Sequence, residues 1–168
     1  MWLYVSIAII VVCFGLVVVR GAPYVPSHRH QLRRAFGELH PLSDDDVVVD
    51  LGSGDGVVLR EARRSGASAI GYELNPLLVG LSRVLSRGDD KVRVLMEDYL
   101  RVTSLPCNTT VVYAFTTGRD IVAIDRKLQQ WSRDQTVFFI SYGFTVPDKR
   151  ELRSLDAMHL YKYESISV

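Results

Sequence analysis

The sequence predicts an α/β domain, in which strands and helices alternate along the chain and a mainly parallel sheet forms the core. Two observations carry this prediction. A glycine loop directly follows a buried strand near residue 50, and a second short strand ends in a carboxylate about twenty residues later. A third observation is a long run without charged residues at the amino terminus. The chain of 168 residues has room for one globular domain and one appended segment.

The glycine loop follows a run of three valines. Residues 47–49 are β-branched and indicate a buried strand, and the residues after them place glycine at every second position. Such a loop turns the chain sharply into a helix that begins near Val57. It also lets a ligand approach backbone N–H groups that a Cβ atom would shield. The candidate ligand-binding residues here are Asp50, Gly52, Ser53, Gly54, Asp55 and Gly56.

The second strand, over residues 69–73, ends at Glu73. A Rossmann-like domain places an acidic residue here, about twenty residues beyond the glycine loop, where it accepts both ribose hydroxyls of a nucleoside. The loop departs from the Gly-x-Gly-x-x-Gly dinucleotide fingerprint and carries Asp50 and Asp55, whose charges suit a cationic ligand and would repel a pyrophosphate. The sequence therefore predicts a site for a nucleoside with a positive charge.

The rest of the domain continues the alternation of elements. Helices are expected over residues 28–39, 57–65, 76–87 and 120–131, and strands over 92–96, 110–115, 136–141 and 158–163. The first helix is expected to pack on the sheet edge. Asn75 can cap the third helix, whose apolar face comprises Leu77, Leu78, Leu81, Val84 and Leu85. Too few residues remain for a long final hairpin, which allows for a sheet shortened below the usual seven strands.

These motifs resemble those of a known family. Residues 50–56, Glu73, and Asp98 after the third strand are similar to the motifs of the class I S-adenosylmethionine-dependent methyltransferases, over about residues 47–141. The resemblance implies S-adenosyl-L-methionine as the cofactor and a Rossmann-like class I methyltransferase sheet. It also implies that Asp98 binds the adenine amino group. Glu97 is expected to point away, because only one of two successive side chains of a strand can face the cleft.

A narrower resemblance adds the amino-terminal apolar segment, residues 23–27 and residues 71–76, in that order. With these segments the chain resembles the small membrane-anchored protein-lysine methyltransferases whose mitochondrial members modify the ATP synthase c-subunit and the adenine nucleotide translocase. This resemblance implies a lysine of a membrane protein as the acceptor, and it makes residues 24–27 part of the active-site cover. A plain spacer is the alternative role for those residues.

Phe115, Tyr142 and Phe144 follow the fourth and fifth strands and are candidates for the acceptor channel. Methyl transfer from a sulfonium is an in-line displacement, so the protein must position two reactants, exclude water and supply a neutral amine. An apolar cleft favours that form because desolvation lowers the pKa of a lysine amine. Ring faces also suit a cation. Packing in the core or at the rim is the alternative role of the three rings.

The residues after the fourth strand argue against several acceptors. Methyltransferases of adenine or glutamine amino groups end this strand in Asn/Asp-Pro-Pro-Tyr/Phe, whereas residues 115–118 are Phe-Thr-Thr-Gly. A cytosine C5 enzyme needs a Pro-Cys nucleophile after the strand, but the Pro-Cys pair at 106–107 precedes it. The chain also departs from the lysine methyltransferase pattern, because it lacks a glycine-proline turn after Phe115 and an arginine near Tyr142.

The amino-terminal residues 2–19 carry no charge, and a helix of about eighteen residues spans roughly 27 Å, close to the hydrocarbon thickness of a bilayer. A single-pass transmembrane anchor fits better than a cleaved signal peptide, because no Lys or Arg precedes the run and Val-Val-Val-Arg ends it. The charged residues that come next, before Glu38, are all basic: Arg20, Arg29, Arg33 and Arg34. The positive-inside rule then places the domain on the cytoplasmic side.

The predicted organisation is an anchor over residues 1–20, a basic juxtamembrane linker and helix over 21–43, and the S-adenosylmethionine-binding domain over 44–168. The 20 basic residues nearly balance the 19 acidic ones, so no nucleic-acid partner is expected. Cys13 and Cys107 imply no disulfide framework. His28, His30 and His40 have no cysteine or carboxylate at metal-ligand spacing, so no metal is expected.

Two alternatives to protein-lysine methylation stay open. One is a methyltransferase for a lipid or small molecule at the membrane. The other is a catalytically silent module that binds S-adenosylmethionine as a sensor or scaffold, since the residues that bind a cofactor do not by themselves establish transfer. A membrane-protein acceptor agrees with the predicted anchor, because confinement to one surface raises the effective concentration of enzyme and acceptor.

Overall fold

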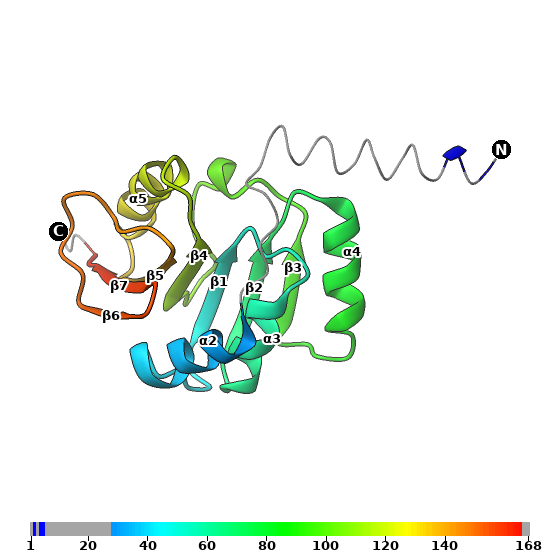
Figure 1. Ribbon diagram of the computed structural model, residues 1–168, viewed down its shortest axis with the longest axis horizontal. Coiled ribbons are helices and arrows are strands. Elements are labelled where there is room, and N and C mark those ends of the chain that lie inside the picture. Colours follow the sequence, from blue (N-terminus) through cyan, green and yellow to red (C-terminus); the bar gives the residue numbers. More distant parts are fainter. Residues whose placement is uncertain (1, 3, 6–27, 166–168) are drawn as a thin grey trace.

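Seven strands form one mixed sheet in the computed structural model, which describes residue 2, residues 4–5 and residues 28–165 (Figure 1). The strand order is β3-β2-β1-β4-β5-β7-β6; β1 to β5 run parallel, and β7 runs antiparallel to β5 and β6. This arrangement confirms the predicted Rossmann-like α/β sheet. The strands are β1 (Val47–Leu51), β2 (Ser68–Tyr72), β3 (Val92–Leu95), β4 (Val111–Phe115), β5 (Val137–Tyr142), β6 (Arg153–Leu155) and β7 (Met158–Tyr163).

The sheet is complete, so the shortening that the sequence allowed for does not occur. β7 forms over residues 158–163, as predicted, and a strand of only three residues, β6, precedes it and pairs with it. Asp156, with a φ of 53°, lies in the tight turn between the two strands. Because so short a strand suffices to close the sheet, seven strands fit into a chain that has no room for a long final hairpin.

Helices cover both faces of the sheet (Figure 1). On one face, α2 (Arg29–Arg34) and its continuation η1 (Ala35–Leu39) pack with α3 (Val57–Arg64) and α4 (Pro76–Leu85). The other face is covered by α5 (Asp120–Trp131), and a short 3₁₀ turn, η2 (Tyr99–Arg101), follows β3. The parallel strands are therefore buried on both sides, as is usual for sheets of this kind.

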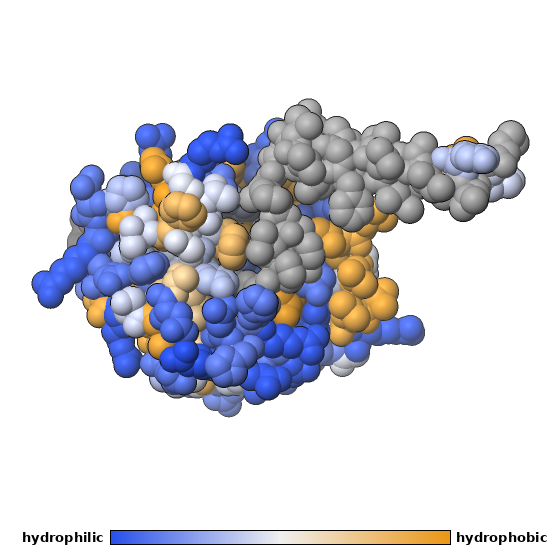
Figure 2. Space-filling view, in the orientation of Figure 1, coloured by the Kyte–Doolittle hydropathy of each residue, from blue (hydrophilic) through white to orange (hydrophobic). Residues whose placement is uncertain are grey.

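The apolar face predicted for α4 does not point toward the sheet. The buried residues of this helix are Val79 and Ser82. Four of the five predicted apolar residues are exposed, at 43% for Leu77, 45% for Leu81, 69% for Val84 and 49% for Leu85, whereas Leu78 is half-buried. Figure 2 shows the resulting group of apolar side chains over α4. The start of the helix is as predicted, because Oδ1 of Asn75 accepts a hydrogen bond from the Leu77 N–H at 2.9 Å.

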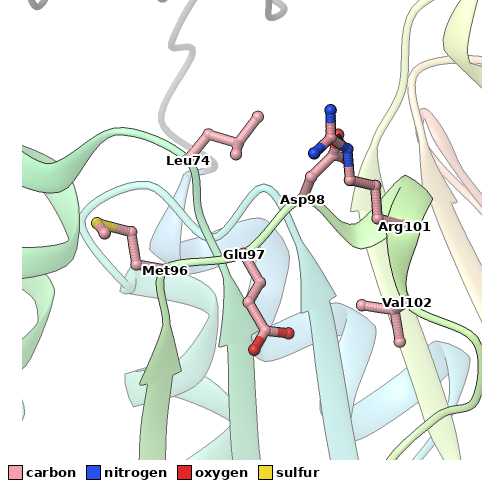
Figure 3. A pocket seen from close by; sticks show the side chains of 6 residues that line it. All are labelled: Leu74, Met96, Glu97, Asp98, Arg101 and Val102. Atoms are coloured by element: carbon pink, nitrogen blue, oxygen red, sulfur yellow. Dashed lines mark ion pairs between the residues drawn. The ribbon is translucent and has the colours of Figure 1, made fainter.

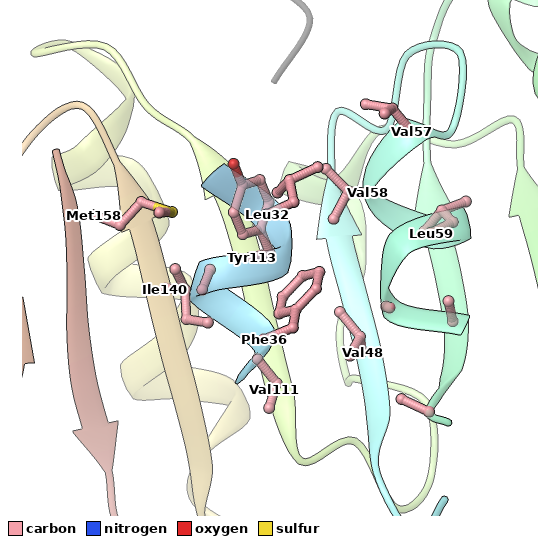
Figure 4. Packing of buried hydrophobic residues seen from close by; sticks show 14 of the residues in the cluster. Leu32, Phe36, Val48, Val57, Val58, Leu59, Val111, Tyr113, Ile140 and Met158 are labelled. Carbon is pink, nitrogen blue, oxygen red and sulfur yellow. The ribbon is translucent and has the colours of Figure 1, made fainter. Parts of the chain in front are cut away.

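The helix predicted over residues 28–39 packs on the face of the sheet and not on its edge. Leu32 and Phe36 are buried against Val48, Tyr113 and Ile140 of the three strands β1, β4 and β5 (Figure 4). The rings of Phe36 and Tyr113 lie edge to face, with centroids 6.3 Å apart. The apolar spacing of the sequence shows that this helix is amphipathic, whereas the part of the sheet that it covers depends on the tertiary structure.

Several predictions concern residues outside those that the structure describes. Residues 21–27 of the predicted linker lie there, as do Arg20, Cys13 and the predicted anchor apart from residues 2, 4 and 5. Within the described part of the chain, no helix has the length and apolar character needed to cross a membrane. Cys107 is exposed, and its thiol is free.

Gly71 is required where β2 packs against the glycine loop. A Cβ atom on this residue would lie 2.5 Å from Cβ of Ser53 and 2.8 Å from Cδ1 of Leu59, so the loop or α3 would have to shift. We expect Gly71→Ala to lower the free energy of unfolding by about 1–3 kcal/mol, as overpacking does. Equilibrium denaturation of the full chain measures this. The control is Gly80→Ala, where a Cβ atom meets nothing within 4 Å and alanine should be neutral or stabilising; equal effects of the two changes would contradict the expectation.

Candidate functional site

The predicted ligand-binding residues gather at the carboxyl edge of the sheet. The glycine loop follows β1, Glu73 follows β2, and Asp98 follows β3. Because β1 lies between β2 and β4, successive crossovers leave it in opposite directions. Open α/β sheets bind ligands in the crevice that forms at such a point, outside the carboxyl ends of the strands.

Backbone hydrogen bonds hold the glycine loop beside the end of β2. The N–H groups of Gly52 and Ser53 both donate to the carbonyl of Tyr72, each at 2.9 Å. Gly52, Gly54 and Gly56 have φ values of 87°, 54° and 80°, in the left-handed region that favours glycine. A Cβ atom on Gly52 would meet no atom within 4 Å, so this side of the loop borders open space in which a ligand can approach the backbone.

Glu73 closes the loop from the β2 side. Its Oε2 atom accepts a hydrogen bond from the Gly54 N–H at 2.8 Å, and its Oε1 atom accepts one from the Asn75 N–H at 2.7 Å. Each oxygen of a carboxylate can accept two hydrogen bonds, so each retains one acceptor position. The carboxylate is thus held in one orientation and can still accept two hydroxyl groups, which is what the ribose of a nucleoside requires.

Asp50 is a buried carboxylate with an unused acceptor. The residue is 2% exposed, and its Oδ2 atom has no hydrogen-bond partner among the described residues. Burial first, and then the negative charges of Glu73 and Asp55, raise the pKa of Asp50 well above its ordinary value. Buried charges are normally paired. This carboxylate therefore fits a positively charged group of a ligand and disfavours a phosphate.

Asp55, in contrast, is engaged by the start of α3. Its Oδ1 atom accepts a hydrogen bond from the Val57 N–H at 3.1 Å, and its Oδ2 atom lies 3.2 Å from Nη2 of Arg60. The sequence predicts Asp50 and Asp55 together as ligand-binding residues, but the structure gives Asp55 contacts that cap a helix. Ser53, also predicted in this group, is buried, and its hydroxyl has no partner within the described part of the chain.

An open pocket of about 610 Å³ lies past the end of β3 (Figure 3). Oδ1 of Asp98 accepts a hydrogen bond from the Leu100 N–H at 2.9 Å, and Oδ2 lies 3.7 Å from Nε of Arg101. Glu97 and Asp98 both border this pocket, and their side chains point in opposite directions (Figure 3). Both residues lie beyond β3, which ends at Leu95. The residues that line the pocket are Leu74, Met96, Glu97, Asp98, Arg101 and Val102.

Two of the three predicted aromatic residues lie together. The rings of Phe115, at the end of β4, and Tyr142, at the end of β5, meet edge to face with centroids 5.0 Å apart. The Tyr142 hydroxyl donates a hydrogen bond to Oε1 of Gln31 in α2 at 2.6 Å. Phe144 is exposed in the loop after β5, where its ring lies near Gly118. The site edge of the sheet therefore carries one aromatic pair, with a third ring at the surface beyond it.

Three polar residues beyond those predicted hold this region together. The Oγ atoms of the buried residues Thr116 and Ser141 lie 2.9 Å apart. The Ser141 hydroxyl donates to the Phe144 carbonyl at 2.5 Å, and the Phe144 N–H donates to Oγ1 of Thr116 at 3.3 Å. These bonds tie the loops after β4 and β5. Thr116 and Ser141 could have been predicted as site residues, because they are polar and lie at the ends of two predicted strands. Gln31 could not, because it contacts Tyr142 from a helix far upstream and no local pattern indicates that contact.

The site as a whole combines acceptors for hydroxyl groups at Glu73 with a buried carboxylate at Asp50. Asp98 contributes a further carboxylate at the rim of the pocket. Within the described residues, no cluster of three or more His, Cys, Asp or Glu side chains could hold a metal ion. The arrangement fits a nucleoside that carries a positive charge.

Comparison with known proteins finds relatives over parts of the chain. No family model matches the sequence. The ATP synthase c-subunit lysine N-methyltransferase of Xenopus laevis is 46% identical over 61 residues, which are 36% of this chain and 26% of that protein. The human protein of that name is 29% identical over 115 residues, 67% of this chain and 48% of that one. The adenine nucleotide translocase lysine N-methyltransferase of Mus musculus is 43% identical over 63 residues, 37% of this chain and 27% of that one. The matches thus span less than half the length of these relatives.

A solved structure matches a larger share of the chain. An RNA methyltransferase from Salinibacter ruber, in complex with S-adenosyl-L-homocysteine, superimposes with a TM-score of 0.72 and 26% identity over 86% of this chain and 96% of that one. The ribosomal RNA small subunit methyltransferase A of Thermotoga petrophila is 30% identical over 79 residues, 45% of this chain and 30% of that protein. The proteins similar to this chain therefore share a type of reaction and differ in their acceptors.

Proposed function

We propose that this chain transfers a methyl group from S-adenosylmethionine to the side-chain amine of a lysine in a membrane protein. By fold it is a class I S-adenosylmethionine-dependent methyltransferase. Over part of its length it is related to lysine N-methyltransferases of the ATP synthase c-subunit and the adenine nucleotide translocase. The observation that carries the choice of acceptor is the 46% identity, over 61 residues, with a lysine methyltransferase.

The residues of the site support this cofactor. Glu73 retains two acceptor positions for the ribose hydroxyls, and the unpartnered Oδ2 atom of Asp50 fits the cationic amino group. Asp98 borders the pocket in which a base can lie. When bound, the sulfonium supplies an activated methyl group. The chain's own residues then have to orient the cofactor and keep water from it.

The acceptor amine must be neutral when it attacks, and the aromatic pair supports this requirement. Phe115 and Tyr142 present apolar ring surface at the edge of the sheet that holds the glycine loop. Burial of a lysine side chain beside such rings lowers the pKa of its amine, so the proton is lost to solvent before transfer. The protein then needs no strong base.

The location belongs to the same proposal. Residues 1–20 form a single-pass anchor, and the catalytic domain lies on the cytoplasmic side, as the arginines that follow the apolar run favour. An anchored enzyme and a membrane-protein acceptor meet on one surface, which raises their effective concentration.

Methyl transfer to membranes from cells that lack the gene tests the function. The full chain is incubated with S-adenosylmethionine labelled in the methyl group, and proteins and lipids are analysed separately by mass spectrometry. We expect a methylated lysine in a membrane protein, matching a site that is methylated in cells with the gene and unmethylated in the deletion. The variant Glu73→Ala should transfer no label. Label confined to lipid or to small molecules, or cofactor binding without any transfer, would overturn the proposal.

RNA methylation is a second candidate function. It is favoured by the superposition on nearly the full length of an RNA methyltransferase. The sequence Phe-Thr-Thr-Gly at 115–118 argues against the exocyclic amino group of a base as the acceptor, because enzymes that methylate adenine amino groups carry Asn/Asp-Pro-Pro-Tyr/Phe at this place. The same labelling reaction with total RNA from the deletion cells distinguishes the two, because label in RNA and none in protein would replace lysine as the acceptor.

Breaking the hydrogen bond between Gln31 and Tyr142 is expected to impair transfer more than cofactor binding. Gln31→Leu leaves the phenol without its acceptor, so the ring is held less firmly against Phe115. A net hydrogen bond is worth about 1 kcal/mol, which corresponds to a fall in kcat/KM for the acceptor of about fivefold. Gln129→Leu, which removes an exposed hydrogen bond to Asp125 on α5, is the control. A similar fall in the control, or an equal loss of cofactor affinity, would contradict the expectation.

A further inference from the structure

Helix α4 buries polar residues beside Val79 and leaves four of its apolar residues exposed. Its buried side contains Ser82, and three buried polar atoms lie along it, Nδ2 of Asn75 and the hydroxyls of Ser82 and Ser86. None of them has a hydrogen-bond partner in the part of the chain that is described. A surface helix of a globular protein normally shows the opposite arrangement, with its apolar stripe on the core. The outward side of α4 is therefore suited to an apolar environment.

The outward residues form one continuous surface. The exposed residues 77, 81, 84 and 85 recur at the spacing of one helix face. Leu74 and Met96, which are also exposed, extend this face to the pocket that Asp98 borders. Figure 2 shows the apolar side chains over α4 as a group. Contiguous exposed apolar residues mark a site of interaction, unlike apolar residues scattered singly. We call this group the α4 surface: Leu74, Leu77, Leu81, Val84, Leu85 and Met96.

The basic residues of α4 favour an anionic lipid surface. Residues 75–88 include Arg83 and Arg87 and no acidic residue, whereas Glu73 lies before this stretch and Asp89 and Asp90 follow it. Arg83 donates two hydrogen bonds to the Val94 carbonyl, at 3.2 and 2.7 Å, whereas Arg87 is exposed. Apolar side chains accompanied by arginine are typical of helices that lie at the surface of anionic bilayers.

The chain between the predicted anchor and the domain is short. Residues 20–27 can span at most about 29 Å when fully extended. The domain begins with α2, which packs on α3, and Ser82 of α4 lies against Gly56 at the start of α3. Packed helices lie about 8–10 Å apart, so the two steps from α2 to α3 and from α3 to α4 add up to roughly 20 Å. A bilayer that holds the anchor is thus within reach of the α4 surface.

We propose that the α4 surface inserts into the headgroup region of an anionic lipid bilayer and holds the pocket edge of the domain at the membrane. The proposal rests on the proposed function for its membrane location. It adds a second contact, which sets the orientation of the domain. Leu74 and Met96 belong both to this surface and to the lining of the pocket in which the base can lie, so this pocket opens next to the lipid.

Lipid quenching of a fluorophore on α4 tests the proposal. The full chain is placed, one copy per disc, in nanodiscs of phosphatidylcholine and phosphatidylglycerol with spin-labelled lipid. A Cys13→Ser, Cys107→Ser background carries Val84→Cys, labelled with an environment-sensitive fluorophore. Val122→Cys on α5, where the valine is 40% exposed against 69% for Val84, is the matched control. We expect quenching at position 84 to be roughly threefold stronger than at 122, and weaker in discs of phosphatidylcholine alone or with Arg87→Gln.

Equal quenching at positions 84 and 122 would overturn the proposal. So would a blue-shifted emission at 84 without quenching, because it would mean that protein, either the anchor segment or another chain, covers the α4 surface. Methyl transfer by the same labelled variants is measured with membranes from cells that lack the gene, which supply the acceptor. Transfer without quenching refutes the α4 contact alone, whereas quenching without transfer refutes the proposed function alone.

Discussion

Replacing Glu73 by alanine is expected to raise the dissociation constant of S-adenosylmethionine by about a hundredfold or more. The side chain offers two acceptor positions for the ribose, and it also holds the N–H groups of Gly54 and Asn75. Hydrogen bonds to a charged group are worth about 1.5–3 kcal/mol each, so the loss of two is sufficient for this effect. Isothermal titration calorimetry of the full chain measures it, with S-adenosylmethionine and, separately, with NAD.

Glu73→Gln is the discriminating second variant. The amide keeps the length of the side chain and one acceptor oxygen. Its NH₂ group replaces the other oxygen, so it cannot accept the hydrogen bond that the Gly54 or the Asn75 N–H donates to Glu73. An intermediate loss of affinity, about tenfold, is expected. Denaturation midpoints of both variants should show that the domain is folded. Unchanged affinity in Glu73→Ala, or binding of NAD by the unmodified chain, would contradict the assignment of this site.

Replacing Asp50 by asparagine is expected to weaken cofactor binding and, at the same time, to leave the ligand-free fold as stable or more stable. The buried Oδ2 atom lacks a partner among the described residues, so ionising the carboxylate at neutral pH is costly without a ligand. Asparagine removes that cost, and with it the charge that a cationic ligand needs. We expect a rise in the dissociation constant of about tenfold to a hundredfold.

The pH dependence of stability follows from the raised pKa of Asp50. A carboxyl group whose pKa is higher in the folded state than in the unfolded state contributes stability when it is protonated. That contribution is present below the ordinary value of 3.8 and is lost as the pH rises toward the folded-state pKa. Denaturation of the ligand-free chain over a pH series should therefore show this loss in the unmodified protein and not in Asp50→Asn.

Asp55→Ala is the matched control from the same loop. Because Asp55 accepts from the Val57 N–H and pairs with Arg60, its loss should lower the free energy of unfolding by about 1 kcal/mol, as loss of a helix cap does. The dissociation constant of the cofactor should stay within about twofold. If Asp55→Ala and Asp50→Asn had the same effects, the structural distinction between the two aspartates would be wrong.

Much of the fold is encoded in local patterns. The three valines and the alternating glycines predict β1 and its loop, and the helix over 120–131 and the strand over 158–163 have the predicted bounds. Local patterns suffice here because a strand, a glycine turn and an amphipathic helix each depend on residues within about one turn or one strand length. The strand that the sequence did not reveal is β6, whose three residues are too few to show a pattern of their own.

Local sequence patterns are enough to predict the alternation of elements. They also predict that Asp50, Glu73 and Asp98 lie at one edge of the sheet, because parallel strands joined by helices end on the same side. The burial of Asp50, in contrast, depends on the tertiary structure, because its neighbours in the sheet are Gly71 of β2 and Tyr113 of β4, which are distant in the sequence. The tertiary structure also decided that α4 shows leucines outward. Periodicity identifies an apolar stripe on a helix. What this stripe packs against depends on residues distant in the sequence or on molecules outside the chain.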